Sequence, residues 1–530
     1  MSSVARRLTQ CQYYRMILKE FSNALILDKP SGASTHTPDG GVTEGFLEMA
    51  QRLFDRTLWA VHRLDHGTSG CLLVTTSKEA VMEWTQKLKS AKKKYIFISP
   101  HESKESVWKY EGRIEKTGNH RFELVEGISN SFTKFAKLGT SPFGFLYEAE
   151  ISSGKTHQIR IHAQASGIPI LGDAEHGGNP FVRLMLHSKS LDFEGEKYIS
   201  PLPTLFIQKE KPDTDHAKFL SSYDRRRFLI NFEKKNTDSF RLVHREWTKN
   251  FKPKLCIEKL GDVLQFQNYT EKTIQPHFAQ TLTESIGCKK WFIRTMKNRG
   301  LSVALENNNI NSSIELPDKW VITENKIKFE MRSNQGLSTG LFLDQRENRK
   351  KVLQSSEGKR VANFFSYTCG FSLAAALGGA HEVISIDTSG ATLDWGKCNF
   401  KLNGLNPDQY DFFVADSIFF LKACLKRERQ FDLIIIDPPT FSRHKHGVFN
   451  LNENLDELLD FAFKCLAPHG RLLFTLNDES ITSQFLGRRL ELSVERTIKK
   501  VIRLERCHPP YDFEFPLERN TVMKGFWIYL

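Results

Sequence analysis

The residues best suited to chemistry in the first half of this chain are a carboxylate, an aromatic ring and a guanidinium, each in its own segment. Asp65 ends the run His62-Arg63-Leu64-Asp65, Tyr95 follows a lysine run, and Arg160 lies within Gly154–His162. Breaking and remaking the bond between a base and its ribose needs a carboxylate beside the sugar, an aromatic platform for a flipped base and a cation that keeps the carboxylate ionised. The three segments supply these residue types for the conversion of uridine to pseudouridine, which needs no metal or diffusible cofactor.

Each of these residues also has an ordinary structural explanation. Asp65 could cap a helix, because Asp is a frequent N-cap residue, and Tyr95 could simply be an aromatic residue of a strand. The basic run before Tyr95 is either a solvated face or a contact for RNA phosphates, and its members are Lys92, Lys93 and Lys94. Three histidines of the same segments are expected to be structural hydrogen-bond donors: His62, His157 and His162.

Five segments in this order resemble the RluA-type family of RNA pseudouridine synthases: ILDKPSGASTH, HRLDHGTSG, GKTHQIRIH, PILGD and RLMLHSKSLDF. The resemblance covers residues 22–210. It implies that Asp65 is the catalytic aspartate, that Tyr95 packs against the target base and that Arg160 pairs with Asp65. Arg63 would help to fill the gap left by the flipped nucleotide. Two departures are visible: His176 replaces the tyrosine of many relatives, and no S4-type RNA-binding module is expected before the first segment.

A second candidate site lies at the ends of apolar runs in the last third of the chain. The run Val361–Phe365 leads into the turn Ser366–Phe371, whose backbone N–H groups could face a cofactor at a helix N-terminus. Asp387 ends the next run, where an acid can bind both ribose hydroxyls, and Asp416 could accept from an adenine amino group. A nicotinamide-binding fold is the rival interpretation. The sequence Asp437-Pro438-Pro439 after a later run favours methyl transfer from S-adenosylmethionine instead.

These segments resemble bacterial 23S ribosomal RNA methyltransferases of the RlmI and RlmK type over residues 336–480, through GLFLDQREN, NFFSYTCGFSLAAALGGA, SIDTS, NFKLNGL and IDPPTFS. The resemblance implies that Asp344 and Arg346 close over the methionine end of the cofactor, although an intradomain salt bridge is an equal contender. Asp437 would also be the catalytic residue. The full set expected to contact S-adenosylmethionine is Asp344, Arg346, Phe365, Ser366, Tyr367, Thr368, Gly370, Asp387, Asp416, Asp437, Pro438 and Pro439.

The methylated base is open between guanine and cytosine. Methylation of cytosine at carbon 5 requires a cysteine nucleophile, and the 5-methylcytidine branch carries one in the strand after Asp-Pro-Pro. Here that run, Arg471–Asp478, has no cysteine, while Cys465 is expected in the core and Cys369 stands where relatives have glycine. The sequence DPPTFS resembles the 7-methylguanosine branch, whereas the tail MKGFWI resembles the 5-methylcytidine branch. Guanine N7, which is already a nucleophile, is the favoured acceptor.

The elements that must position these residues differ between the two halves. The first half predicts an α+β domain, for which the family resemblance implies a mixed, mainly antiparallel sheet. After Lys350 apolar runs alternate with helix-length segments, which is typical of parallel βαβ units and of a doubly wound, Rossmann-like α/β methyltransferase domain of class I. With breaks near 201–216 and 307–313, the predicted parts are a synthase domain 1–210, a linker 211–239, a small α/β module 240–320 and a methyltransferase domain 321–530.

Charge and composition indicate the partner and the compartment. A net charge of +13 favours a polyanion, since neutralising phosphates releases counterions. The expected partner is RNA, with 23S ribosomal RNA favoured by the resemblance and transfer RNA permitted. Nine scattered cysteines without zinc spacing argue against metal and a disulfide framework. No secretory segment or membrane-length apolar run is apparent, so a cytoplasmic location is expected.

Two further functional alternatives stay open. One domain could be active while the other only binds RNA. The second domain could also methylate a protein, although the Asn-Pro-Pro-Tyr motif that would favour this is absent.

Overall fold

The structure is a computed structural model that describes residues 16–37, 45–118, 121–152, 154–233, 236–244, 255–269, 273–295, 310–313, 316–334, 338–444, 447–478, 480–497, 503–507, 509–513 and 523–530. The chain divides into two compact units, Met1–Glu233 and Lys234–Leu530. The N-terminal residues 1–15 and residues 307–309 of the second composition break lie outside the described residues.

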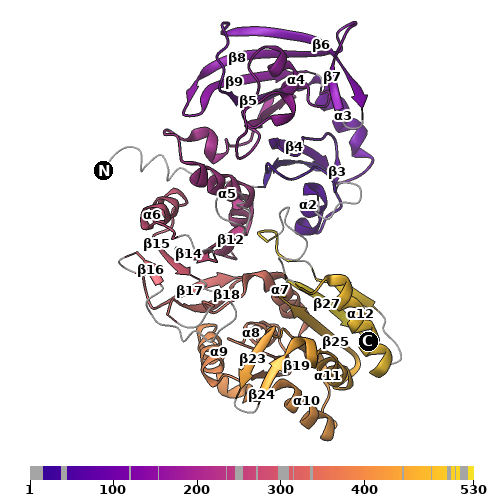
Figure 1. The fold of residues 1–530 in the computed structure, drawn as a ribbon. Helices are drawn as coiled ribbons and strands as arrows, with labels where there is room; N and C mark the ends of the chain where they lie inside the picture. The colour runs from indigo at the N-terminus through magenta and orange to yellow at the C-terminus, as the bar shows by residue number, and fades with distance from the viewer. Residues whose placement is uncertain are drawn as a thin grey trace. The chain divides into compact units, whose positions relative to one another are not determined.

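The first unit is built around one large sheet, coloured indigo to magenta in Figure 1. Its strand order is β1-β2-β4-β10-β5-β9-β8-β6-β7, with β11 beside β10 and β3 beside β4. Among the described strand pairs of this sheet, β4 with β10 is parallel and the others are antiparallel. The expected α+β fold with a mixed, mainly antiparallel sheet is therefore confirmed. The strands are β1 (Ile17–Glu20), β2 (Ala24–Lys29), β3 (Trp59–Ala60), β4 (Ser69–Thr75), β5 (Lys92–Ser99), β6 (Val107–Gly118), β7 (Arg121–Val125), β8 (Ser131–Ser141), β9 (Gly144–Ile151), β10 (Leu186–Phe193) and β11 (Glu196–Ile199).

Short helices cover this sheet and support the loops between its strands. Trp84 and Leu88 of α3 pack on Ala24, Leu73 and Leu191 in a buried core, which fixes the start of β5 directly after the helix. The helical segments are α2 (Phe46–Phe54), α3 (Ala80–Ser90), α4 (Gln158–Ala165), η1 (Ala174–His176), η2 (Thr204–Ile207) and α5 (Thr214–Glu233).

The segment predicted as a linker is mostly the helix α5, and it belongs to the first unit. Asp224 accepts hydrogen bonds from the backbone N–H of Thr204 at 2.9 Å and from its hydroxyl at 2.6 Å. Arg226 is fully buried. The charged composition of this stretch favours a linker, but a few residues such as Asp224 and Arg226 attach the helix to the first unit.

The second unit begins with a small five-stranded sheet of order β12-β13-β14-β15-β16 and a separate hairpin, β17 with β18. The pairs are antiparallel except β14 with β15, which are joined through the helix α6. This arrangement agrees with the expected small α/β module. Its elements are β12 (Ser239–His244), β13 (Leu255–Leu260), β14 (Val263–Asn268), α6 (Pro276–Ser285), β15 (Lys290–Thr295), β16 (Ile310–Ser312), β17 (Lys319–Glu324) and β18 (Ile327–Arg332).

The rest of the second unit is a seven-stranded sheet of order β21-β20-β19-β22-β25-β27-β26, whose first five strands are parallel. β27 pairs antiparallel with both β25 and β26. The strand order reverses beside β19, which makes the carboxyl ends of β19 and β22 a topological switch point. The strands are β19 (Arg360–Phe364), β20 (Glu382–Asp387), β21 (Asp411–Val414), β22 (Phe431–Ile436), β25 (Leu466–Leu476), β26 (Arg503–Arg506) and β27 (Lys524–Tyr529), and a hairpin is formed by β23 (Phe441–His444) and β24 (Gly447–Asn450).

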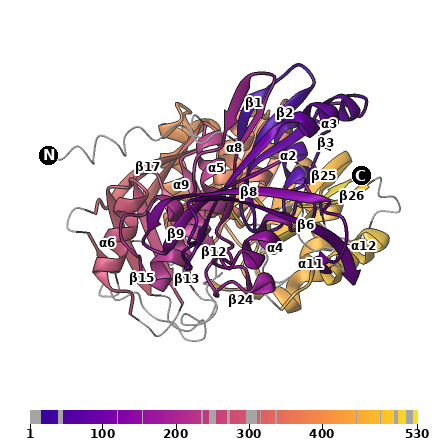
Figure 2. The same cartoon turned by 90° about the horizontal axis from the view of Figure 1, so that it is seen from above.

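Helices cover both faces of this sheet, so the doubly wound fold expected from the sequence is confirmed (Figure 1). Alternate strand residues point to opposite cores: Ile434 and Ile436 pack with α10 to α12, while Leu433 and Ile435 pack with α7 to α9. Figure 2 shows α11 and α12 close to each other, and Arg496 of α12 pairs with Asp460 of α11 at 2.8 Å. The helical segments are η4 (Leu343–Gln345), α7 (Arg346–Ser355), α8 (Gly370–Leu377), α9 (Gly390–Leu402), η5 (Pro407–Gln409), α10 (Ser417–Lys426), α11 (Leu451–Lys464) and α12 (Ser483–Thr497).

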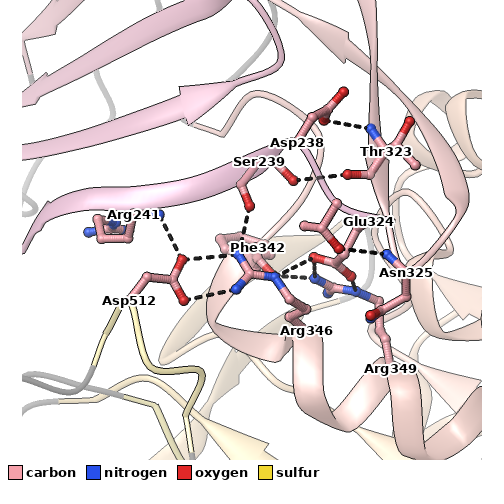
Figure 3. A network of polar contacts seen from close by, with 11 residues as sticks. Asp238, Ser239, Arg241, Thr323, Glu324, Asn325, Phe342, Arg346, Arg349 and Asp512 are labelled. Carbon is pink, nitrogen blue, oxygen red and sulfur yellow. Dashed lines mark hydrogen bonds and ion pairs between the residues drawn. The ribbon is translucent and has the colours of Figure 1, made fainter. Parts of the chain in front are cut away.

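A buried polar network joins the small module to α7 (Figure 3). Arg346 donates to both carboxylate oxygens of Asp512, at 2.8 and 3.0 Å, and to the carbonyl of Ser239 at 2.7 Å. Arg349 forms a second bidentate pair with Glu324, at 2.7 and 2.8 Å. All four charged side chains are buried, so losing one partner would leave an uncompensated charge in the interior. The network fixes the start of α7 relative to β12 and β17.

Among the helices that the structure describes, none combines the length and the hydropathy that crossing a bilayer requires.

Candidate active sites

The residues predicted to act on a nucleotide line one cavity of about 370 Å³ in the first unit. Asp65 lies in the loop before β4, Tyr95 on β5 and Arg160 on α4. These distant segments meet because β4 and β5 both pair with β10, and because α4 directly follows β9, the other neighbour of β5. Arg63 lines the same cavity. The structure thus brings the predicted catalytic set together, while the role of each member stays a prediction.

The carboxylate of Asp65 faces two basic side chains. One oxygen lies 3.5 Å from Nη1 of Arg160 and 4.0 Å from Nε2 of His157. Arg160 is held in place by Asp173, to which it donates twice at 2.7 Å, and by Glu175 at 2.8 Å. Burial alone would lower the pKa of Arg160, but the carboxylates of Asp173 and Asp65 outweigh it and raise that pKa. The guanidinium is therefore a permanent cation beside Asp65.

The ring of Tyr95 forms part of the cavity wall and is 7% exposed. Burial raises the pKa of its hydroxyl, a hydrogen bond with Ser188 opposes this, and the charge of Asp65 adds to the rise. The hydroxyl stays protonated at neutral pH. The residue can offer an apolar ring and a neutral donor to a base, but not a phenolate.

The three lysines of the basic run point in different directions because side chains alternate along β5. Lys93 lines the cavity with Tyr95, and its ammonium donates to the carbonyl of Ser152 at 3.0 Å. Burial lowers the pKa of Lys93. Lys94 instead pairs with Glu148 at 2.8 Å and with Glu150 at 3.6 Å, whereas Lys92 is exposed at the start of the strand. Only Lys93 of the run is placed at the cavity.

His157 is more involved in the site than a structural donor would be. Its Nδ1 lies 3.1 Å from Nε2 of His176 and 3.5 Å from Glu175, while its Nε2 faces Asp65. Its backbone adopts a left-handed conformation, φ 58°, at the cap of α4, a strained geometry of the kind that gathers at active sites. Burial lowers the pKa values of His157 and His176. The unusual residue at position 176 therefore contacts a neighbour of Asp65.

The other two histidines of the motif have structural surroundings. Nε2 of His62 accepts a hydrogen bond from the backbone N–H of Leu73 at 3.0 Å, and a hydrogen bond with the backbone of Arg63 opposes the effect of burial on the pKa of His62. His162 is fully buried between the hydroxyls of Thr133 at 2.8 Å and Ser131 at 3.2 Å. Burial lowers the pKa of both histidines to about 4. Both rings are neutral at physiological pH.

One group of described side chains has the donor types of a metal site: His157, Glu175 and His176. Arg160 already binds Glu175 and is a cation that a metal ion would have to approach. The donor set is better explained by hydrogen bonding between the two imidazoles.

In the second unit the predicted cofactor residues gather at the carboxyl ends of β19, β20, β21 and β22. The turn from β19 to α8 holds Phe365, Tyr367 and Cys369 with φ values of 54°, 49° and 59°. Glycine is the usual residue in this conformation, yet this turn adopts it with other residues, among them Cys369, which stands where relatives have glycine. Gly396 on α9 leaves room for Cys369, since a Cβ at position 396 would collide with the sulfur.

Two predicted cofactor acids also hold the local backbone. Asp387 accepts from the N–H groups of Tyr367 at 2.8 Å and Ser389 at 2.9 Å, and burial raises its pKa. Asp416 caps α10 by accepting from the N–H of Phe419 at 2.9 Å. The contacts of these acids to a ribose and an adenine stay predictions.

The residues present suit S-adenosylmethionine. Val414 and Phe419, which flank Asp416 in the chain, are 64% and 71% exposed, and such apolar groups at a strand end could cover a flat adenine. The turn after β19 directs Asp387 to the same edge of the sheet. At the switch point, Asp437 follows β22 and accepts from the hydroxyl of Thr475 at 2.7 Å.

Asp344 and Arg346 have different surroundings. Burial raises the pKa of Asp344 to about 7, with the charge of Asp437 adding to the rise and Arg241 opposing it, so Asp344 is near enough to Asp437 to interact with it. Arg346 is committed to Asp512 and Ser239, which is the salt-bridge alternative left open by the sequence. The expectation that Arg346 closes over the cofactor is not supported by these contacts.

Sequence reasoning missed several polar residues around Asp437. Gln345, Asn348 and Thr475 are buried and hydrogen bonded to one another. Gln345 and Asn348 lie on either side of Arg346 and Glu347 in the LDQREN run. Their closeness to Asp344 and Arg346, which were expected at the cofactor, is the feature of the sequence that could have identified them. Cys507 is also near enough for the charge of Asp437 to affect it, but burial raises the pKa of its thiol.

Comparisons with known proteins agree with both halves. Residues 23–165 match the family model of RNA pseudouridylate synthases, and residues 306–517 match that of S-adenosylmethionine-dependent methyltransferases. Ribosomal RNA large subunit methyltransferase K of Neisseria meningitidis serogroup B is 40% identical over 176 residues, which are 32% of this chain and 50% of that protein. Ribosomal RNA large subunit methyltransferase K/L of Shewanella oneidensis is 38% identical over 212 residues, 39% of this chain and 28% of that protein.

The chain thus spans half or less of the length of these curated relatives. Among solved structures, an S-adenosylmethionine-dependent methyltransferase of Streptococcus mutans has a TM-score of 0.48 at 24% identity, with 61% of this chain and 84% of that chain covered. From the two family matches, the chain carries a domain of the RNA pseudouridylate synthase family followed by a domain of the S-adenosylmethionine-dependent methyltransferase family.

Proposed function

We propose that the chain is a bifunctional RNA-modifying enzyme that isomerises uridine to pseudouridine with its first unit and methylates a base with its second. The observation that carries the first activity is the placement of Asp65 beside Arg160 in a cavity walled by Tyr95. Arg160 places a positive charge beside the carboxylate, and Tyr95 offers a ring face to a flipped base. Lys93, which lines the cavity, supplies a cation for a phosphate.

The second activity is proposed to act on a base nitrogen, with guanine N7 favoured. S-adenosylmethionine, when bound, supplies a methyl group activated on sulfur. The chain's own contribution is to hold Asp437 at the switch point and to place the acceptor there. A cytosine acceptor would need a reactive thiolate, and the cysteines described near this site, Cys369 and Cys507, are buried with raised thiol pKa values. This supports a nitrogen acceptor.

Large-subunit ribosomal RNA is the proposed substrate of both units. The names of the relatives that match the second unit refer to this RNA, and the net charge of +13 suits a polyanion. The alternative, with one active unit and one unit that only binds RNA, predicts a single modification.

The test is nucleotide-resolution mapping of pseudouridines and methylated bases in ribosomal and transfer RNA. A deletion strain is complemented with the wild-type chain, Asp65→Asn or Asp437→Asn. We expect Asp65→Asn to abolish pseudouridine formation at its site and to leave the methylated base intact, because each acid serves one unit. Asp437→Asn should reduce methylation at least 100-fold and spare pseudouridine, in the range expected for loss of a positioned catalytic group. Loss of both modifications in both variants would exclude two separate activities.

A further inference from the structure

The carboxylate of Asp437 lies at the end of an unbroken row of four side-chain hydrogen bonds from four different elements. Nε1 of Trp527 on β27 donates to Oδ1 of Asn348 on α7 at 3.1 Å. Nδ2 of Asn348 donates to Oε1 of Gln345 in η4 at 2.8 Å. Nε2 of Gln345 donates to the hydroxyl of Thr475 on β25 at 3.0 Å, and that hydroxyl donates to Oδ1 of Asp437 at 2.7 Å. The four donors are 0–4% exposed.

The direction of this row follows from the chemistry of its two ends. An indole N–H can only donate, and an ionised carboxylate can only accept. Turning either amide around would place two lone pairs, or two N–H groups, against each other in the dry interior, and each group left unsatisfied there is unfavourable. Each hydrogen that bridges two members of the row therefore points towards Asp437. Hydrogen bonds in such a chain polarise one another in the same sense.

We propose that Trp527, Asn348, Gln345 and Thr475 form a one-way relay of hydrogen bonds that keeps the carboxylate of Asp437 ionised and in one orientation at the methyl-transfer site. The four are positioning residues, because they act on the site through Asp437. The inference deepens the proposed methyl transfer and rests on it for its significance, but the relay itself can be tested without cofactor or RNA.

The surroundings of Asp437 show why a relay is needed. Burial raises the pKa of Asp437, while the Thr475 hydrogen bond, the charge of Arg349 and the side chain of Gln345 lower it. Asp344 is a second acid near Asp437, and the charge of Asp437 also raises the pKa of the buried thiol of Cys507. Arg349 supplies a positive charge that lowers the pKa of Asp437, but it is already paired with Glu324. Thr475 and Gln345 are the neutral side chains that favour the ionised form directly; Asn348 and Trp527 would act through them.

The test compares Thr475→Val, which keeps the shape but removes the hydroxyl, with Thr475→Ser, which keeps the donor. Thermal unfolding of the full chain is followed by calorimetry between pH 4 and 8. Because burial raises the folded pKa of Asp437 above its ordinary value of 3.8, stability is lost as the pH rises from the unfolded value to the folded pKa. Thr475→Val raises the pKa further, so its loss of midpoint temperature relative to wild type should grow by about 3 °C over this range, the shift that about one pKa unit gives in a domain of this size.

Three controls separate the relay from simple packing. Thr475→Ser should show little growth of the loss with pH. Trp527→Phe removes the first donor of the row, so its loss should also grow with pH, by less than that of Thr475→Val because three links remain; a Trp527→Phe loss that is constant with pH would overturn the relay beyond Thr475. In an Asp437→Asn background the pH-dependent part of the Thr475→Val loss should disappear. A Thr475→Val loss that is constant with pH, or that persists unchanged in Asp437→Asn, would overturn the relay, whether or not the chain methylates RNA.

Discussion

At the scale of single residues, Lys93 and Lys94 offer a matched pair for testing RNA contact. Lys93 lines the cavity, where its ammonium donates to the carbonyl of Ser152, whereas Lys94 is paired with Glu148 and Glu150. We expect Lys93→Met to weaken RNA binding by up to about tenfold and to reduce the slope of log affinity against log salt by about 1, because one phosphate contact is lost. Lys94→Met should leave both quantities nearly unchanged. Filter binding at several salt concentrations measures them, and equal effects of the two variants would contradict the assignment.

Residue identities predicted which side chains meet, but not how each is bonded. Asp65, Tyr95 and Arg160 could be predicted to meet because their motifs are distinctive in type and order. Asp416 caps α10 and Arg346 holds Asp512, and neither partner lies where sequence spacing would point to it. The left-handed turn of Phe365, Tyr367 and Cys369 could not be predicted from the sequence, because its residues are not glycine. The glycine that makes room for the side chain of Cys369 is Gly396, on the helix α9.

At the scale of elements, α5 shows where composition misleads. Its charged sequence suggested a linker, yet Asp224 binds Thr204, and a Cβ at Gly32 would lie 3.0 Å from the guanidinium of Arg225. Gly32 has φ +80° and donates its N–H to the carbonyl of His66, next to Asp65. The helix therefore packs against the turn that supports the loop carrying Asp65. By contrast, the parallel strands of the second unit could be predicted accurately, because they are buried on both faces and appear as continuous apolar runs.

This role of α5 predicts that Asp224→Ala destabilises the first unit by about 1.5–3 kcal/mol, since two donors of Thr204 lose a buried charged acceptor. Asp215→Ala on the same helix is the matched control. It loses only a partly exposed pair with Lys218 at 3.4 Å and should change stability by less than about 0.5 kcal/mol. Denaturant unfolding of the full chain measures both variants. If Asp224→Ala were as mild as its control, α5 would be a linker after all.

At the scale of the whole molecule, the two units differ in which of their buried groups have shifted pKa values. The first unit buries histidines whose folded pKa values are lowered, to about 4 for His62 and His162. The second unit buries aspartates whose pKa values are raised, to about 7 for Asp344 and also upwards for Asp387. Burial is the largest cause in each case. It favours the neutral form, which is the deprotonated form of a histidine and the protonated form of an aspartate.

The two units should therefore respond to acid in opposite directions between pH 7 and 5. A lowered histidine pKa gives stability that is present above the unfolded value of 6.5 and is lost as the pH falls towards the folded value. A raised aspartate pKa gives stability that is lost as the pH rises towards the folded value, so acidification restores it. Acidification should lower the unfolding temperature of the first unit and maintain or raise that of the second.

Calorimetry of the full chain at pH 7, 6 and 5 measures this divergence, and the transition of the second unit is identified as the one that S-adenosylmethionine shifts upwards. His162→Gln should reduce the acid sensitivity of the first transition, because its amide can bond the same two hydroxyls without titrating. Asp344→Asn should likewise flatten the pH dependence of the second transition. Two transitions that fall together on acidification would show that the stability of the chain is not governed by these separately buried groups.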